Sequence, residues 1–468
     1  MRRTRTSHHK ISHDSIDGLG YDWAQVGADP QQGRHPLTVH LPRTTEEVAL
    51  IVRNARTLGQ RVIVRGSAHS SNNLVTAQRS TLLLTRYLDG VAPVDASAST
   101  VTAQAGVSMG TLDDVLAAQG FGLPICPDHP DISLGGFLSV GGISPASHRH
   151  GLFVDTVTEL EYVDPEGHIR RCGRDADRDQ FNRLLAGLGR HGIVTSVTCQ
   201  VLRTDKRRTV LRNDRTLYRD VDRFIDDATT MLESPGDALM LRGAWIDSGK
   251  LGGRLCLGQM AAYYPVAQTA ARRWRERLSY AYLHWVGRWA ARVPASLHMV
   301  MRYLGVLGVM VSPQYASAKN VEMFTDKALD YNVGDPARNF VVLAPMEQFS
   351  TVFRKVYDRC LLERRAGAFT YITFHVKGIK SAYLNDRDPD RRYGEIMVVV
   401  GCDPQQFTLP LLEEFVADLD ALCVEHDSLR YMHTRTSGDP QLSALVDPNA
   451  RYDRAAERRY SDVGAVRR

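Results

Sequence analysis

Three glycine-rich segments lie within the first 200 residues, and the elements around the third segment limit the fold. GLGRHGIV, residues 187–194, has the G-x-G-x-x-G spacing that binds a dinucleotide when a strand precedes the glycines and a helix follows them. Here the helical pattern DADRDQFNRLLA precedes the glycines, and the β-like stretch GIVTSVTCQVL follows them. This reversed order excludes a nicotinamide-binding Rossmann turn. The local alternative is a helix C-cap and a tight turn built by Gly187, Gly189 and Gly192.

The other two segments have the composition of loops that approach an anion or a flat ligand. RVIVRGSAHSSNN, residues 61–73, runs from a β-branched strand into small residues whose backbone N–H groups and hydroxyls can reach an anion. PDISLGGFLSVGGISPASHRHG, residues 130–151, has Gly-Gly pairs at 135–136 and 141–142, a spacing that suits backbone lying against a planar ligand. For the first of these segments, the alternative is a surface turn with an incidental histidine. For the second, the alternative is a pair of tight turns between strands.

The remaining patterns predict an α+β protein. Thr44 and Glu47 have capping-box spacing before a helix that Gly59 ends, and Thr111 is the expected N-cap of a helix that Gly120 ends. Strands are predicted at residues 37–42, 61–65, 81–86, 99–106, 157–164, 168–172 and 192–202. Helical patterns at 221–233 and 406–426, with β-like runs at 369–378 and 394–402, indicate a second α+β unit.

Composition narrows the functional class. The 468 residues suffice for two or three domains, and 58 basic against 53 acidic residues leave a net charge of only +5, so we expect no nucleic-acid partner. The seven cysteines are scattered without a CxxC pair, which indicates a reducing compartment, and the N-terminus has no apolar signal sequence. We therefore expect a cytoplasmic protein. His148 and His150 lack further ligands nearby, so no metal site is predicted.

The order of the three segments resembles the FAD domain of the vanillyl-alcohol-oxidase flavoproteins, and most closely that of the cytokinin dehydrogenases. The matching positions are Gly66, His69 and Ser70; Gly135, Gly136, Leu138, Ser139, Gly142, Ile143, Ser144, Arg149, His150 and Gly151; and Phe181 with residues 185–195. The resemblance covers residues 30–205 and returns weakly at YMHTRTSG and ARYDRAAERRY. It implies a two-subdomain PCMH-type FAD-binding domain over residues 1–206 with its core at 30–205. An inserted α+β substrate (cap) domain would span residues 207–425, and residues 426–468 would return to the FAD domain.

The resemblance also implies FAD as the cofactor. The residues expected to bind it are Arg65, Gly66, Ser67, Ala68, His69, Ser70, Ser71, Gly135, Gly136, Ser139, Gly142, Ile143, His150, Gly192, Ile193 and Val194. His69 stands where the family's loop histidine carries FAD covalently, so a histidyl-FAD link is predicted, with non-covalent FAD as the alternative. No cysteine lies between Asp128 and His150, so a second covalent link is not expected.

The same resemblance places a catalytic aspartate at Asp128, where a base would accept the proton that leaves as hydride departs. The alternatives are a turn-capping role for Asp128 and the rival Asp131; the family's nearby aromatic residue is Cys126 here. His375, Lys377 and His433 are substrate-pocket candidates, although such side chains more often face water.

The expected function is oxidation of a small organic molecule by hydride transfer to FAD, with oxygen or another electron acceptor. Cytokinin-like amine oxidation is the nearest analogy. The alternatives are an alcohol or lactone oxidase, a double-bond reductase of the same fold, and a non-catalytic membrane-associated protein. The last rests on residues 274–311, where three of the five tryptophans alternate with arginines. That pattern fits either an interfacial helix or helices packed in a cap or dimer interface, and its apolar run is too short to span a bilayer.

Overall fold

The computed structural model describes residues 19, 36–72, 74–75, 79–248, 255–278, 281, 314–323, 337–385, 388–403 and 405–453. Its strands are β1 (Thr38–His40), β2 (Val62–Arg65), β3 (Thr81–Leu84), β4 (Thr100–Gln104), β5 (Val157–Val163), β6 (Ile169–Gly173), β7 (Ile193–Gln200), β8 (Val210–Tyr218), β9 (Met240–Ser248), β10 (Leu255–Val266), β11 (Tyr315–Ser317), β12 (Ala337–Pro345), β13 (Phe369–Lys380), β14 (Arg392–Cys402) and β15 (Leu429–Arg430). Its helices are α1 (Thr45–Thr57), α2 (Met109–Ala118), α3 (Leu134–Val140), α4 (Ser147–His150), α5 (Arg178–Leu184), α6 (Val221–Glu233), α9 (Ala318–Glu322), α10 (Met346–Arg365), α11 (Leu409–Glu425), α12 (Pro440–Val446) and α13 (Ala450–Asp453). The prediction of an α+β fold is confirmed.

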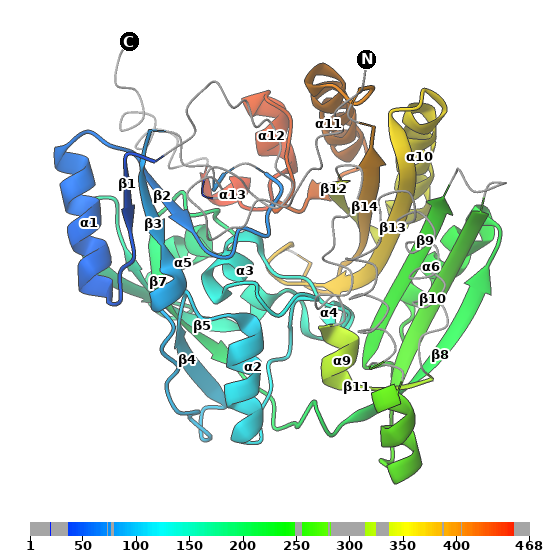
Figure 1. The fold of residues 1–468 in the computed structure, drawn as a ribbon, viewed down its shortest axis with the longest axis horizontal. Coiled ribbons are helices and arrows are strands. Elements are labelled where there is room, and N and C mark those ends of the chain that lie inside the picture. Colours follow the sequence, from blue (N-terminus) through cyan, green and yellow to red (C-terminus); the bar gives the residue numbers. More distant parts are fainter. Residues whose placement is uncertain are drawn as a thin grey trace, which may run out of the picture.

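Strands β1–β7 form two small sheets that share one helix. The first sheet is parallel in the order β1-β3-β2, and the second is antiparallel in the order β4-β7-β5-β6. Helix α1 buries Val48 and Val52 in one apolar cluster with Leu83 of the first sheet and Val163 of the second (Figure 1). Because both sheets bury apolar side chains against this helix, they are held together as one unit.

Local capping signals place the helices, with one correction. The Thr44 side chain accepts from the Glu47 N–H, and Gly59 has φ +62, so α1 begins and ends where its sequence predicts. The predicted N-cap of α2 is wrong. Ser108 caps that helix by accepting from the Thr111 N–H, so α2 starts one turn earlier. The earlier start buries Met109 beside Leu112, and this apolar burial outweighs the local capping preference of Thr111.

The third glycine segment has the helix–glycine–strand order expected from the sequence. Helix α5 precedes it and β7 follows it, while Gly189 and Gly192 have φ values of +73 and +145. A Cβ on Gly192 would stand 2.8 Å from a ring carbon of Tyr162, so this position needs glycine for close packing on β5 as well as for its backbone angle.

Strands β8–β15 build a third sheet of eight antiparallel strands in the order β11-β8-β10-β9-β13-β14-β12-β15. Helices α6, α10 and α11 cover one face, where Trp245, Phe374 and Phe353 belong to one apolar cluster (Figure 1). Side chains of the opposite face, such as Tyr263 and Leu343, belong instead to the cluster that includes α2 and α3. The large sheet is therefore packed between its own helices and the first part of the chain.

The C-terminal segment contacts both parts. Strand β15 pairs with β12 of the large sheet. Beyond it, the Asn449 amide donates to the carbonyl oxygens of Asn182 (3.2 Å) and Leu185 (2.9 Å), which are acceptors left over at the end of α5. Asp447 pairs with Arg190 at 2.8 Å. The domain boundaries near residues 206 and 425 stay predictions. The strands that precede residue 206 belong to other sheets than the strands that follow it.

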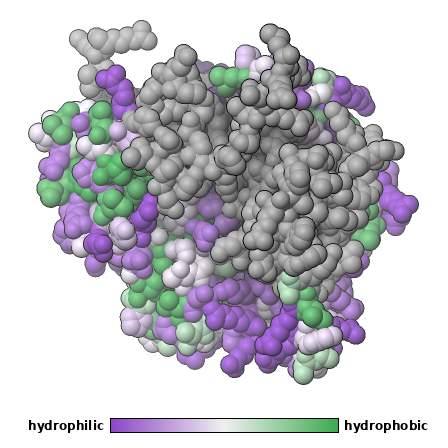
Figure 2. Space-filling view, in the orientation of Figure 1, coloured by the Kyte–Doolittle hydropathy of each residue, from purple (hydrophilic) through white to green (hydrophobic). Residues whose placement is uncertain are grey.

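Residues 274–311, for which an interfacial helix and packed helices are the two alternatives, lie mostly outside the described residues. Residues 270–278 are helical, and Trp274 is 64% exposed, while residues 279–280 and 282–313 are among those not described. Within the described part of the chain, no helix has the length and apolar composition needed to cross a bilayer. In the view of Figure 2, apolar side chains gather on the side where β1 and α1 lie; the exposed ones there include Val39, Leu41 and Leu50.

Candidate functional site

Tertiary contacts bring the three glycine-rich segments side by side. The Ser67 hydroxyl donates to the carbonyl oxygen of Asp131, which joins the first segment to the second. At Gly66 the approach is so close that a Cβ would stand 2.0 Å from the Ser133 hydroxyl. The second segment joins the third through the N–H of Leu188, which donates to the Ser139 carbonyl oxygen at 3.1 Å. The spacing seen in the sequence thus corresponds to one continuous surface of backbone.

The C-terminal stretch closes the same region from another side. The Ser71 N–H donates to the His433 carbonyl oxygen at 2.8 Å, in a parallel bridge between Ser71 and Thr434. The Tyr431 hydroxyl accepts from the Gly142 N–H at 3.1 Å. Residues more than 280 positions apart therefore meet at the first and second glycine segments.

The first segment fits an anionic cofactor group. Ala68 has φ +57, and a left-handed residue among right-handed or extended neighbours turns successive N–H groups toward one point. Within the described residues, the N–H groups of Ser67, Ala68 and Ser70 have no hydrogen-bond acceptor. Unpaired backbone donors at a surface loop are suited to phosphate oxygens, so this loop could hold the pyrophosphate of FAD.

The second segment differs from the expected open loop because its first glycine pair lies in a helix. Ser133 caps α3 by accepting from the Gly136 N–H, and Gly135 and Gly136 fill its first turn. A Cβ on Gly135 would stand 2.9 Å from that of Ala105, so the glycine lets α3 lie against the residue after β4. The second pair does form a turn, since Gly141 and Gly142 have φ values of +110 and +79.

Substituting Gly142 should destabilise the protein strongly. A Cβ there would lie 2.4 Å from that of Phe153, in addition to the strain of the positive φ. We expect Gly142→Ala to lower the free energy of unfolding by about 2–5 kcal/mol. The matched control is Gly189→Ala, with φ +73 and no atom within 4 Å of the added Cβ, which should cost only about 1 kcal/mol. Urea denaturation of both variants measures the difference, and equal losses would contradict the packing argument.

The other predicted cofactor residues occupy varied positions. The His69 ring lies against the His129 ring, with centroids 4.2 Å apart. Arg65 is buried and donates to the Leu19 carbonyl oxygen at 3.4 Å, and Ile143 is buried after the Gly142 turn. His150 ends α4, where burial lowers its pKa, helped by Arg149. Ile193 and Val194 lie at the start of β7, where they pair with Val163 and Tyr162 of β5.

Asp128 lies at the meeting point of the pocket candidates. It is half-buried and interacts electrostatically with His375, Lys377 and His433. The side chain of the rival Asp131 is exposed; its backbone N–H donates to His129 Nδ1 and its carbonyl oxygen accepts from Ser67. Asp128 and these three side chains thus come from three distant segments, the loop before α3, β13 and the stretch after β15.

One row of charged side chains crosses the large sheet on the face opposite its helices. Lys377 of β13 pairs in register with Glu395 of β14, and their side chains form an ion pair at 2.9 Å. Gly243 pairs with Val376, so the preceding residue, Arg242, stands beside Lys377 on β9. Lys377 is only 9% exposed, so it does not face water. The surroundings of Asp128 are accordingly polar and charged.

The next row of the same face contributes neutral polar groups. His375 of β13 pairs in register with Ala244 of β9, and Ala244 pairs in turn with Gln259 of β10. Gln259 is 5% exposed, and its Oε1 has no hydrogen-bond partner within the described residues. His433 Nδ1 likewise has no hydrogen-bond partner there. Buried polar atoms without partners are costly, so these two atoms are suited to a polar ligand.

Burial sets the protonation of these groups. It lowers the pKa of both His375 and His433 to about 4, with Lys377 adding to the shift and Asp128 opposing it, so both imidazoles are neutral at pH 7. For Lys377, burial alone would lower the pKa, but the carboxylates of Glu395 and Asp128 outweigh it and raise the pKa. The site therefore combines a fixed cation with two neutral imidazoles.

The depressed histidine pKa values predict acid sensitivity. An unfolded histidine binds a proton near pH 6.5, whereas folded His375 does so only near pH 4. The contribution of His375 to stability is therefore full above pH 6.5 and is lost as the pH falls from 6.5 to 4. We expect His375→Gln to reduce the loss of Tm between pH 7 and pH 5 by a few degrees, on the order of 3 °C. The charged groups that act on His375, namely Lys377, Asp128 and Arg242, are the same in the wild type and in the His375→Gln variant. The exposed His168→Gln is the control, and an unchanged pH dependence in His375→Gln would contradict the prediction.

Several residues of this site were missed in the sequence. Glu395 and Arg242 carry no motif, and only the strand register reveals them. Tyr431 lies in YMHTRTSG, where the resemblance returns weakly, but only its contact with Gly142 places it at the site. His129 had a weak signal, since it follows Asp128 directly in CPDHPD. Among the described residues, no group of three or more His, Cys, Asp or Glu side chains is placed to hold a metal ion.

Comparison with known proteins identifies the first part of the chain. Residues 36–173 match the family described as FAD binding domain. A putative D-arabinono-1,4-lactone oxidase of Neurospora crassa is 31% identical over 34% of this chain and 28% of its own length. Cytokinin dehydrogenase 7 of Oryza sativa subsp. japonica is 30% identical over 48% and 42%, and an uncharacterized oxidoreductase of Rhodococcoides fascians is 27% identical over 41% and 43%. These matches cover less than half the length of each relative.

Proposed function

We propose that this chain, whose residues 36–173 are an FAD-binding domain, is an FAD-dependent oxidoreductase that oxidises a small organic molecule. When bound, FAD supplies the acceptor for hydride, and oxygen or another acceptor would reoxidise it. The observation that carries the proposal is the position of Asp128 among His375, Lys377 and His433, next to the glycine-rich segments. The names of the relatives, which are oxidases and dehydrogenases, support the same class.

In this proposal the residues of the chain divide the work between cofactor and substrate. The loop around Ala68 holds the pyrophosphate with its backbone N–H groups, and His69 carries the flavin through a covalent bond. Asp128 accepts the N–H or O–H proton of the substrate as hydride leaves the neighbouring carbon, a transfer that a positioned base accelerates by about 10²–10⁴-fold. His375 and His433, which are neutral at pH 7, bind the substrate's polar groups through hydrogen bonds.

The charged row favours the second candidate reaction, oxidation of an alcohol or lactone, over cytokinin-like amine oxidation. An apolar substrate would leave the buried Gln259 oxygen without a partner and would face the Lys377–Glu395 ion pair, which costs binding energy. Hydroxyl groups can both donate to and accept from such side chains. The substrate class that fits this pocket best is therefore a small hydroxylated molecule.

The test begins with the visible spectrum of the purified protein, followed by acid precipitation. Flavin colour is expected, and a protein that stays colourless after FAD is added would refute the proposal.

Anaerobic bleaching should then be followed with sugar lactones, polyols, simple alcohols and amines including cytokinins. Bleaching by hydroxylated compounds is expected; bleaching by amines alone would return the assignment to amine oxidation. Bleaching by NAD(P)H alone would favour a reductase. Vesicle flotation that depends on residues 274–311 in a flavin-free protein would favour the non-catalytic alternative.

A further inference from the structure

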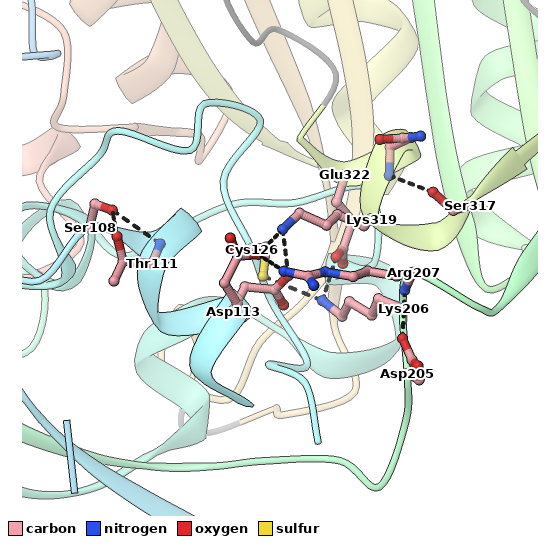
Figure 3. A network of polar contacts seen from close by, with 12 residues as sticks. Ser108, Thr111, Asp113, Cys126, Asp205, Lys206, Arg207, Ser317, Lys319 and Glu322 are labelled. Carbon is pink, nitrogen blue, oxygen red and sulfur yellow. Dashed lines mark hydrogen bonds and ion pairs between the residues drawn. The ribbon is translucent and has the colours of Figure 1, made fainter. Parts of the chain in front are cut away.

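A buried ion network lies beside the loop that carries Asp128. Lys206, in the connection from β7 to β8, donates from Nζ to Cys126 Sγ at 3.3 Å and forms an ion pair with Glu322 at the end of α9 (Figure 3). The Lys206 and Glu322 side chains are 7% and 1% exposed. At its edge, Lys319 of α9 pairs with Asp113 of α2 at 3.6 Å. None of these residues belongs to the glycine segments or to the charged row of the large sheet.

The network joins segments from both parts of the chain. The stem of Lys206 passes Gly122, where an added Cβ would stand 3.3 Å from Lys206 Cε, before the ammonium reaches Cys126. Helix α9 follows β11, which pairs with β8 of the large sheet, and the Lys319 N–H donates to the Lys206 carbonyl oxygen at 3.2 Å. Figure 3 shows Lys206 pointing from its connection toward both the Cys126 loop and α9. Lys206 is thus the point where α2, the Asp128 loop and α9 are connected.

Lys206 has little freedom to move. Burial alone would lower its pKa, but the carboxylates of Glu322 and Asp113 outweigh burial, so the pKa is raised and the ammonium stays charged. A buried ammonium cannot leave its carboxylate partner without a penalty of several kcal/mol. Cys126 is fully buried, and burial raises the pKa of its thiol far above the usual range, so it acts as a neutral acceptor. The ion pair therefore presents a fixed donor to the loop two residues before Asp128.

We propose that Lys206 is a positioning residue for Asp128, which it holds in place through its bond to Cys126 while Glu322 anchors it from the large-sheet side. Cys126, Pro127 and Asp128 are consecutive, so a shift of Cys126 moves the carboxylate, while α2 holds the loop further along, by backbone bonds to residues 130 and 132. Displacement of a catalytic group by about 1 Å can cost about 100-fold in rate. The catalytic role of Asp128 in this inference rests on the proposed function. The structural link, meaning the contacts of Lys206 with Cys126 and Glu322, does not depend on that function.

The sharpest variant is Cys126→Ala, which removes the acceptor and leaves the Lys206–Glu322 ion pair intact. Cys126→Ser restores an acceptor, and Cys199→Ala is the matched control. Cys199 lies in the same apolar cluster and is 1% exposed, and no hydrogen bond of its side chain is found within the described residues. Glu322→Gln tests the link from α9 by removing the charge that anchors Lys206.

Hydrogen–deuterium exchange of the full chain with added FAD measures the structural link. The amides of Ile125, Cys126, Asp128 and His129 should exchange about fivefold faster in Cys126→Ala and in Glu322→Gln, as expected for the loss of one hydrogen bond. Cys126→Ser should restore wild-type exchange, and Cys199→Ala should leave this loop unchanged. Unchanged loop exchange in Cys126→Ala, or an equal increase in Cys199→Ala, would overturn the proposal.

The kinetic arm uses the compound that bleaches the wild-type flavin most rapidly. The reduction rate should fall at least about tenfold in Cys126→Ala with the substrate Kd within about twofold, and Cys126→Ser should recover it. Faster loop exchange with an unchanged reduction rate would overturn the positioning role. A wild-type protein that no compound reduces would contradict the proposed function instead, and the exchange result would still decide the structural link.

Discussion

Replacing His69 by alanine should move all flavin colour from the acid-precipitated pellet to the supernatant. A covalent bond survives denaturation, whereas flavin held only by the folded protein is released when the fold is lost. Among the residues of this site, His69 is the one we propose as the covalent link. The expected change is therefore complete loss of pellet-bound flavin, measured by absorbance and by the mass of the intact chain.

The loop should keep its shape in His69→Ala because two of its anchors use neighbouring residues and not the His69 side chain. On one side the Ser67 hydroxyl donates to the Asp131 carbonyl oxygen, and on the other the Ser71 N–H donates to the His433 carbonyl oxygen. FAD should accordingly still bind, through the N–H groups of the loop. The variant thus separates attachment of the cofactor from its binding.

His129→Ala is the matched control, since it removes the ring against which His69 lies and leaves His69 itself. Pellet-bound flavin should persist in this control. Covalent flavin that remains in His69→Ala would contradict the assignment of the link. Wild-type flavin that is already in the supernatant would discard the covalent bond while leaving the proposed flavoenzyme intact.

Elements with strong local signals could be predicted from the sequence, and elements set by tertiary burial could not. Helix α1 has a capping threonine and a glycine stop, and it forms as predicted. For α2, two hydroxyl residues three positions apart could each serve as the cap, and burial of Met109 decides in favour of Ser108. Gly135 and Gly136 disfavour a helix locally, yet α3 forms there because Ser133 caps it and Leu134 and Leu138 are buried.

The candidate site shows the same division. Asp128 and the glycine segments could be proposed from the sequence, because each lies in or beside a short stretch that matches a family pattern. Glu395 and Arg242 reach the site through strand register, which sets β14 and β9 on either side of β13 and leaves no trace in a single sequence. Lys206 lies in a connection without a motif, and its role depends on α9, more than 100 residues later.

Asp128→Asn should slow flavin reduction by about 10²–10⁴-fold while leaving FAD binding unchanged. Asparagine has nearly the same shape and can still form hydrogen bonds, but its amide cannot accept the substrate proton. The negative charge of Asp128 raises the pKa of both His375 and His433, so its removal lowers those pKa values further. Both imidazoles stay neutral in the variant, and the lost rate cannot come from their protonation.

Asp131→Asn is the control for this prediction because it makes the same chemical change three residues away in the same loop. Its side chain is exposed, and the bonds that hold the loop at this residue use backbone atoms, so the reduction rate should stay within about twofold of the wild type. Stopped-flow bleaching under anaerobic conditions measures both variants against the wild type. An Asp128→Asn rate equal to the wild type would reduce Asp128 to a turn residue. Slow reduction in Asp131→Asn with normal reduction in Asp128→Asn would transfer the role of base to Asp131.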